Sequence, residues 1–83
     1  MPFERLKRAR KKTVGTKQTI KAVQKGQAKV VYVARDADAH VVEPVIRACR
    51  ENNIPLIQVE SMRELGRVCG IAVGCASASI TEE

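Results

Sequence analysis

The residues most able to do chemistry lie in the stretch GTKQTIKAVQKG, from Gly15 to Gly26. Its pattern predicts a short helix in which Gly26 forms a left-handed cap at the end. Lys17 and Gln18 fall in the first turn, and Lys21 lies one turn further on. The start of a helix presents free backbone N–H groups and the positive end of the helix dipole, so it attracts phosphate and other electronegative groups.

The two leading lysines are unusual because lysine opposes the dipole at the start of a helix, where acids are preferred. The alternative interpretation is that they are solvated surface charges, as lysines on an exposed helix face commonly are. A locally unfavourable charge indicates a ligand. Gln18 both donates and accepts hydrogen bonds, which suits a base edge as well as a phosphate. The stretch therefore predicts a site for an anion, with nucleic acid as the partner.

The charge of the chain is divided along its length. Residues 1–29 carry ten Lys or Arg residues and one acid, whereas residues 30–83 carry five Arg and eight acids. A basic front on a neutral-to-acidic body is typical of a polyanion binder, although a solubilising basic tail would have the same composition. The chain has one Tyr, one Phe and no Trp, which argues against folds that stack bases on aromatic residues.

Cysteine and histidine do not form a recognisable catalytic or metal-binding pattern. Cys49, Cys69, Cys75 and His40 lack the spacing of a zinc site. The scattered cysteines are interpreted as small buried hydrophobes in a reducing cytoplasm. The aspartates of the turn RDADAH lack the further ligands of a calcium loop and are expected to form a turn and cap a helix. We therefore expect no cofactor, no metal and no catalytic residue, with an enzyme built on Cys69 or Cys75 as an alternative.

Hydrophobic periodicity predicts the elements that position these residues, in the order α-α-β-α-β-α-β. Thr16, Ile20 and Val23 are expected to face the core from the second helix. A capping box of the type S-x-x-E opens the last helix, and Pro44 fits best in a first turn. The expected helices cover residues 2–12, 16–25, 43–53 and 61–70, and the expected strands cover residues 29–34, 56–60 and 75–80, followed by a frayed tail.

This order predicts an α/β fold, a three-layer α/β/α sandwich with a small mixed sheet. Residues 1–83 are expected to form a single domain, because no linker or repeat interrupts them. No apolar run approaches the ~20 residues that span a bilayer, and the charged N-terminus lacks the apolar core of a signal peptide. A cytoplasmic protein without membrane contact is therefore expected.

The segment GIAVG has two interpretations. Ile71, Ala72 and Val73 stand between two glycines directly after the last expected helix. They form either the lead-in to a buried strand or an apolar lip that packs on an unstacked base. Taken alone, the segment favours the lead-in.

Two longer segments, GTKQTIKAVQKGQAKVVYVARDAD and ACRENNIPLIQVESMRELGRVCGI, closely resemble the kink-turn RNA-binding family. Its members include ribosomal proteins seven-Ae and thirty-e and small bacterial relatives of the YbxF type. The match covers residues 6–80, and its most specific parts are G-x-K-Q-T-x-K and I-P…S-x-x-x-L-G…C-G-I. The resemblance implies a non-enzymatic, monomeric protein that binds kink-turns, in ribosomal RNA, a riboswitch or another RNA. A protein–protein or stress-signalling module on the same fold is the alternative.

The resemblance also implies which residues bind the RNA, a bent duplex with tandem sheared G·A pairs. The first turn of the second helix would enter the widened major groove at those pairs, and the loop before the last strand would cover a flipped-out nucleotide. Many relatives have Asn-Glu in place of Lys17-Gln18 and a basic residue in place of Met62, which would remove one phosphate contact here. The implied RNA-binding residues are Gly15, Thr16, Lys17, Gln18, Lys21, Asp38, Val42, Ile71, Ala72 and Val73.

Overall fold

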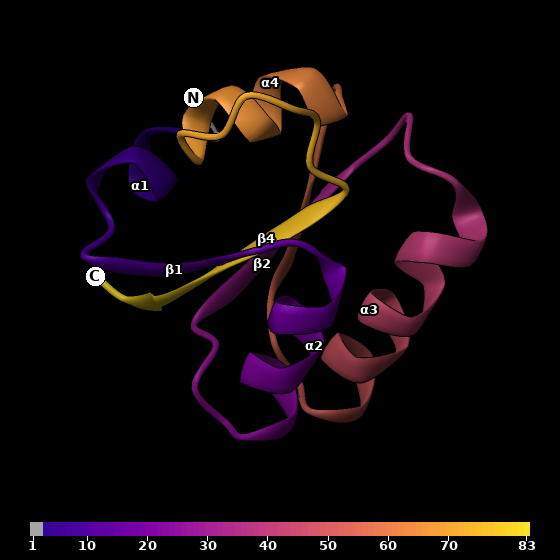
Figure 1. The fold of residues 1–83 in the computed structure, drawn as a ribbon. Helices are drawn as coiled ribbons and strands as arrows, with labels where there is room; N and C mark the ends of the chain where they lie inside the picture. The colour runs from indigo at the N-terminus through magenta and orange to yellow at the C-terminus, as the bar shows by residue number, and fades with distance from the viewer. Residues whose placement is uncertain (1–2) are drawn as a thin grey trace.

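A computed structural model describes residues 3–83 as four helices and a four-stranded sheet (Figure 1). The helices are α1 (Phe3–Arg8), α2 (Thr16–Gln24), α3 (Ala39–Glu51) and α4 (Met62–Val68). The strands are β1 (Lys11–Val14), β2 (Val30–Ala34), β3 (Leu56–Val59) and β4 (Ser77–Glu82). None of the helices in this part of the chain has the length and apolar character needed to cross a bilayer.

The sheet is mixed, and its strand order is β1-β4-β2-β3. β4 runs antiparallel to both of its neighbours, β1 and β2, whereas β3 runs parallel to β2. Helices α1 and α4 cover one face of the sheet, and α2 and α3 cover the other (Figure 1). The predicted three-layer α/β/α sandwich with a small mixed sheet is therefore confirmed.

β2 forms the centre of the core, as its continuous run of β-branched residues predicted. All five of its residues are buried. Val30, Tyr32 and Ala34 pack with side chains of α1 and α4, including the buried Leu6 and Leu65. The alternate residues of the strand pack against α2 and α3 on the other face. This alternation follows from the two-residue period of a strand that is covered on both sides.

The first segment differs from the single helix that was expected over residues 2–12. Pro2 lies outside the described residues; within them α1 ends at Arg8, and the chain continues as β1. In β1, Lys12 pairs with Ile80 and Thr13 pairs with Ser79 of β4. Backbone pairing along a sheet edge makes this segment a strand, so its sequence Lys-Lys-Thr-Val needs no apolar alternation. The prediction of a helix here was wrong for that reason.

Two other boundaries differ from the expectation. α3 begins at Ala39, earlier than residue 43, because the Oδ1 atom of Asp38 accepts the N–H of His40 at 2.8 Å and caps the helix. Pro44 consequently lies inside α3 rather than in its first turn. β4 covers residues 77–82 rather than 75–80, and the tail is not frayed at Glu82, which pairs with β1.

Two local signals were confirmed. Gly26 has φ +72°, as expected for the glycine that ends α2. Ser61 caps α4, because its hydroxyl accepts the N–H of Glu64 at 3.1 Å. The core face of α2 was only partly predicted, since its buried residues are Thr19, Ala22 and Val23, while Thr16 and Ile20 are half-buried.

A seam of hydroxyl groups fixes α2 on the sheet. The Thr13 hydroxyl lies 3.1 Å from that of Thr19 and 2.5 Å from that of Ser79, so it joins β1, α2 and β4. The Ser77 hydroxyl donates to the Thr16 hydroxyl at 3.2 Å. Thr19, Ser77 and Ser79 have no exposed surface. Buried polar groups are costly unless they are paired, so the seam tolerates few alternative positions of α2.

The replacement Thr13→Val tests the seam. Valine has nearly the same shape but no hydroxyl, so Thr19 and Ser79 would lose their shared partner. We expect the free energy of unfolding to fall by about 1–3 kcal/mol, measured by urea denaturation. Thr81→Val in β4 is the matched control, because Thr81 lies on the same sheet outside the seam. Equal losses in the two variants would contradict a special role for the seam.

A second prediction concerns Gly66 in α4. A Cβ atom at this position would lie 2.1 Å from the backbone oxygen of Val73, well inside contact distance. Helix propensity alone would make Gly66→Ala stabilising by up to about 1 kcal/mol. We expect the opposite sign, a lower melting temperature followed by circular dichroism, because the loop must move away from the helix. An unchanged or raised melting temperature would show that the loop yields freely.

Candidate nucleic-acid interface

Three segments meet at one end of the sheet, where strand β2 ends and strand β4 begins (Figure 1). Because β4 is antiparallel to both neighbours, Val14 at the end of β1 pairs with Ala78, and Val33 near the end of β2 pairs with Ser77. The start of α2, the turn into α3 and the loop before β4 therefore emerge together. We call this the interface edge. Every RNA-binding residue implied by the resemblance lies there, within segments 15–21, 38–42 and 71–73.

Hydrogen bonds link the segments of the interface edge. The N–H of Gly15, in front of α2, donates to the carbonyl of Ser77 in β4 at 2.9 Å. The N–H of Met62, at the start of α4, donates to Oδ1 of Asp36 in the turn after β2 at 2.8 Å. The segments are thus held to the sheet and to one another rather than hanging free from it.

The start of α2 presents uncapped backbone donors. The first N–H that bonds within the helix is that of Thr19, which donates to the carbonyl of Gly15 at 3.0 Å. Within residues 3–83, the N–H groups of Thr16, Lys17 and Gln18 have no hydrogen-bond acceptor. Gly15 offers no capping side chain, and the first turn has no acid. Three donors at the positive end of a helix dipole therefore lack a protein acceptor, which is the arrangement that binds anions.

Gly15 and Thr16 set the geometry of this helix start. Gly15 has φ +97° and ψ +155°, a backbone conformation open essentially only to glycine. Thr16 is half-buried and bonded to Ser77, as described above. These two residues therefore orient the first turn, and their own side-chain surface is small.

Lys17, Gln18 and Lys21 provide the exposed side chains of the helix start. Among the described residues, neither lysine has an acidic partner within ion-pair distance. Two unpaired cations next to free N–H donors make this surface electropositive, and they leave it suited to phosphate oxygens and to acceptor atoms on bases.

The turn from β2 into α3 contributes Asp38 and Val42. Asp38 is exposed; its Oδ1 atom caps α3, which leaves the second carboxylate oxygen free in the described part of the chain. Val42 is half-buried and packs on the α2–α3 core cluster. Both aspartates of the turn act as helix caps, as expected from the sequence, because Asp36 caps α4. Asp38 can therefore accept one further hydrogen bond without giving up its structural role.

The loop before β4 leads into a buried strand, as the segment taken alone favoured, and its apolar side chains also form an exposed lip. Val73 is 71% exposed and Ile71 is 36% exposed, and Ala72 between them is also exposed. The loop is nevertheless anchored along α4. The N–H of Ile71 donates to the carbonyl of Gly66, and that of Cys75 to the carbonyl of Met62, each at 3.0 Å. Large apolar side chains that a fold holds in solvent indicate a contact surface.

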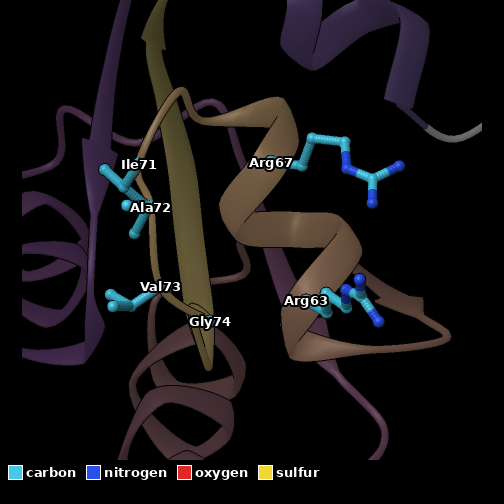
Figure 2. A pocket seen from close by; sticks show the side chains of 6 residues that line it. All are labelled: Arg63, Arg67, Ile71, Ala72, Val73 and Gly74. Carbon is cyan, nitrogen blue, oxygen red and sulfur yellow. The ribbon is translucent and has the colours of Figure 1, made fainter.

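A cavity of about 250 Å³ lies where the loop meets α4. Arg63 and Arg67 of α4 and the loop residues 71–74 line it (Figure 2). The sequence analysis did not single out the two arginines. A signal was present, because they lie four residues apart on one short helix and like charges at that spacing repel. Their proximity to the apolar lip, however, comes only from the fold.

The Arg-rich first helix lies away from the interface edge along β1. Arg10 and Lys11 come within 4.0 Å and 3.8 Å of Glu82, and Arg5 forms an ion pair with Glu83. The basic front of the sequence is therefore split by the fold. Its lysines on α2 reach the interface edge, and part of its remaining charge is balanced by the acidic end of β4.

The three cysteines are free thiols, and none of them is exposed. Cys49 and Cys75 are buried, and Cys69 is half-buried. The hydrogen bond with Cys75, together with burial, raises the pKa of Cys69, so its thiol stays protonated at neutral pH. Residues 3–83 contain no group of three or more His, Cys, Asp or Glu side chains placed to hold a metal ion.

Known proteins resemble this chain along most of its length. The chain is 45% identical over 80 residues to RNA-binding protein YbxF of Geobacillus stearothermophilus, covering 96% of this chain and 98% of the relative. It is 48% identical over 69 residues to RNA-binding protein TTE2299 of Caldanaerobacter subterraneus, covering 83% and 84% of the two chains.

A solved structure of a Giardia lamblia 15.5 kD RNA-binding protein superposes with a TM-score of 0.81 at 32% identity. The match covers 87% of this chain, which spans 61% of the Giardia chain. The family model described as Ribosomal protein L7Ae/L30e/S12e/Gadd45 matches residues 3–83. On this match, and on identities above 40% along nearly the whole chain, the protein belongs to the ribosomal protein L7Ae/L30e/S12e/Gadd45 family.

Proposed function

We propose that this protein binds kink-turn RNA through the interface edge and stabilises its kinked form without catalysing a reaction. One observation carries the proposal: unpartnered backbone donors, unpaired lysines and an exposed apolar lip share one edge of the fold. The RNA-binding relatives and the family membership support RNA as the partner. The protein is proposed to act as a single domain and a monomer in the cytoplasm, on a kink-turn of ribosomal RNA or a riboswitch.

The start of α2 would enter the widened major groove at the tandem sheared G·A pairs. Its three free N–H groups and the ammonium groups of Lys17 and Lys21 are donors, and guanine presents two acceptors, O6 and N7, on its groove edge. The same lysines would neutralise the phosphates that a sharp bend brings together. The start of α2 would therefore recognise the sheared pairs by donating hydrogen bonds to the acceptor atoms of guanine.

Gln18 and Asp38 would set the register. The Gln18 amide both donates and accepts, so it can contact a base that offers one acceptor and one donor. The free oxygen of Asp38 can accept only from a donor such as an exocyclic amino group. Because a carboxylate repels phosphate, Asp38 favours a pose in which a base, not the backbone, approaches the turn.

The apolar lip would cover the nucleotide that a kink-turn flips out. Ile71 and Val73 offer exposed apolar surface at the interface edge, and Ala72 between them adds little bulk. An unstacked base loses contact with its neighbours and gains it again on such a surface. The extended RNA has no flipped-out base at this place, so the contact favours the kinked form selectively.

Binding of this kind shifts a conformational equilibrium through differential affinity alone. Moving an RNA from 1% to 99% kinked requires a preference for the kinked form of about 5.5 kcal/mol. A few charge-assisted hydrogen bonds at about 1.5–3 kcal/mol each, present only in the kinked form, would supply it.

A gel shift with two RNAs tests the function. One RNA contains an intact kink-turn, and in the other the G·A pairs are replaced by Watson–Crick pairs, with length and composition otherwise kept. We expect binding of the second RNA to be weaker by at least about 100-fold, because it lacks the groove geometry that α2 needs. Equal affinity for both RNAs would leave only a basic, non-specific binder.

The contribution of the helix start can be measured with Lys17→Ala and Gln18→Ala. Each is expected to weaken kink-turn binding by about tenfold, which corresponds to one lost polar contact of about 1.4 kcal/mol. Lys25→Ala is the matched control, because it removes the same charge from the far end of α2. Lys17→Ala should also reduce the slope of log affinity against log salt by about 0.7–0.9. If Lys25→Ala weakened binding as much, general charge rather than the helix start would explain it.

A further inference from the structure

Arg63 and Arg67 are the feature of the interface edge that the proposed function leaves without a role. Elsewhere among residues 3–83, Arg35 pairs with Glu60 and Arg47 pairs with Glu43. Neither Arg63 nor Arg67 has an ion-pair partner in that part of the chain. Like charges one helical turn apart destabilise a helix slightly, and neither arginine gains a salt bridge to Glu64 of the same helix.

The positions of the arginines on α4 define a path across the helix. Gly66 lies on the side that faces the loop, in contact with Val73. Glu64 lies towards α1, because it lines a second cavity together with Phe3 and Lys7 of that helix, and Arg67 borders the same cavity. With 100° per residue, Arg63 and Arg67 fall between these two sides and form the solvent-facing ridge of α4. Figure 2 shows both guanidinium groups extending away from the loop side chains.

The dimensions of this ridge fit the backbone of one nucleic-acid strand. Residues four apart on a helix are separated by about 6 Å along its axis. Phosphates of one strand of a duplex rise by about 3.4 Å per nucleotide along the duplex axis, so about 6 Å along the helix corresponds to roughly two nucleotides, within the reach of two flexible arginine side chains. The cavity of about 250 Å³ beside the lip is smaller than the 300–1,000 Å³ of ordinary small-molecule pockets. A cavity of this size is too small to enclose a drug-sized ligand.

We propose that Arg63 and Arg67 bind the backbone phosphates that flank the flipped-out nucleotide and guide that RNA strand from the apolar lip across α4. This inference rests on the proposed function, because it assumes that a kink-turn occupies the interface edge. Arginine suits the role because its planar group donates to two phosphate oxygens at once. The close contact between Gly66 and Val73 fixes the loop on α4. The apolar lip and the two arginines therefore keep one relative position and can bind the base and its flanking backbone together. Met62 carries no charge, and the ridge supplies the cations on this helix.

The experiment uses the double variant R63Q/R67Q and a synthetic kink-turn RNA, with affinity measured over a range of salt concentrations. Glutamine keeps helix propensity close to that of arginine, so the fold should be retained, which a thermal melt checks. We expect affinity to fall by about tenfold and the salt slope to fall by about 1.4–1.8 for two lost phosphate contacts. Arg50→Gln is the matched control, since Arg50 is exposed at the end of α3 that lies on the opposite edge of the sheet.

Neutral methylphosphonate groups placed singly at the phosphates flanking the flipped-out nucleotide locate the contact. They should weaken binding of the unmodified protein and have no further effect on R63Q/R67Q. If R63Q/R67Q binds with unchanged affinity and slope while Lys17→Ala still weakens binding, the phosphate path is wrong and the kink-turn proposal stands. If Lys17→Ala and replacement of the G·A pairs also have no effect, the proposed function itself fails.

Discussion

The position of β4 between β1 and β2 is the constraint on which the rest of the structure depends. The last strand of the chain pairs with the first two, antiparallel to both, so the ends of β1 and β2 lie beside its start. Segments from the front, middle and end of the chain thereby reach one edge. A parallel β4 would have brought its leading loop to the opposite edge, away from the start of α2.

The packing of α2 explains how a helix can be fixed and yet leave its start open. Its first half is held by hydroxyl groups of both neighbouring strands rather than by apolar contact alone. Hydrogen bonds are directional, whereas hydrophobic contact is not, so the seam sets the rotation of the helix as well as its position. The sheet thus positions the start of the helix without a side-chain cap, and three N–H donors next to Gly15 stay free. Removal of a buried hydroxyl would therefore affect both stability and the aim of these donors.

The apolar lip presents a related balance between exposure and order. Exposed valine and isoleucine side chains are hydrated unfavourably. A mobile loop would also lose conformational entropy if it became ordered on binding a partner. The loop is already ordered in the folded protein. Val73 packs closely on Gly66, and the backbone N–H groups of Ile71 and Cys75 donate to carbonyls of α4, so little further entropy would be lost on binding. A side chain at Gly66 would favour helix formation but would displace the loop that packs against the helix.

Local signals in the sequence determined much of this protein. The capping serine of α4, the glycine that ends α2 and the apolar run of β2 were sufficient to predict those elements, because each depends on neighbours within a few residues. The prediction of an anion site at the start of α2 likewise used only local residues, Lys17 and Gln18. Only the tertiary structure decided that residues 11–14 form a strand, since their partner lies 66 residues away for the Thr13–Ser79 pair. It also decided that Ile71 and Val73 are exposed and that Arg63 and Arg67 lie beside them, because the exposure and proximity of side chains depend on contacts between segments that no local pattern records.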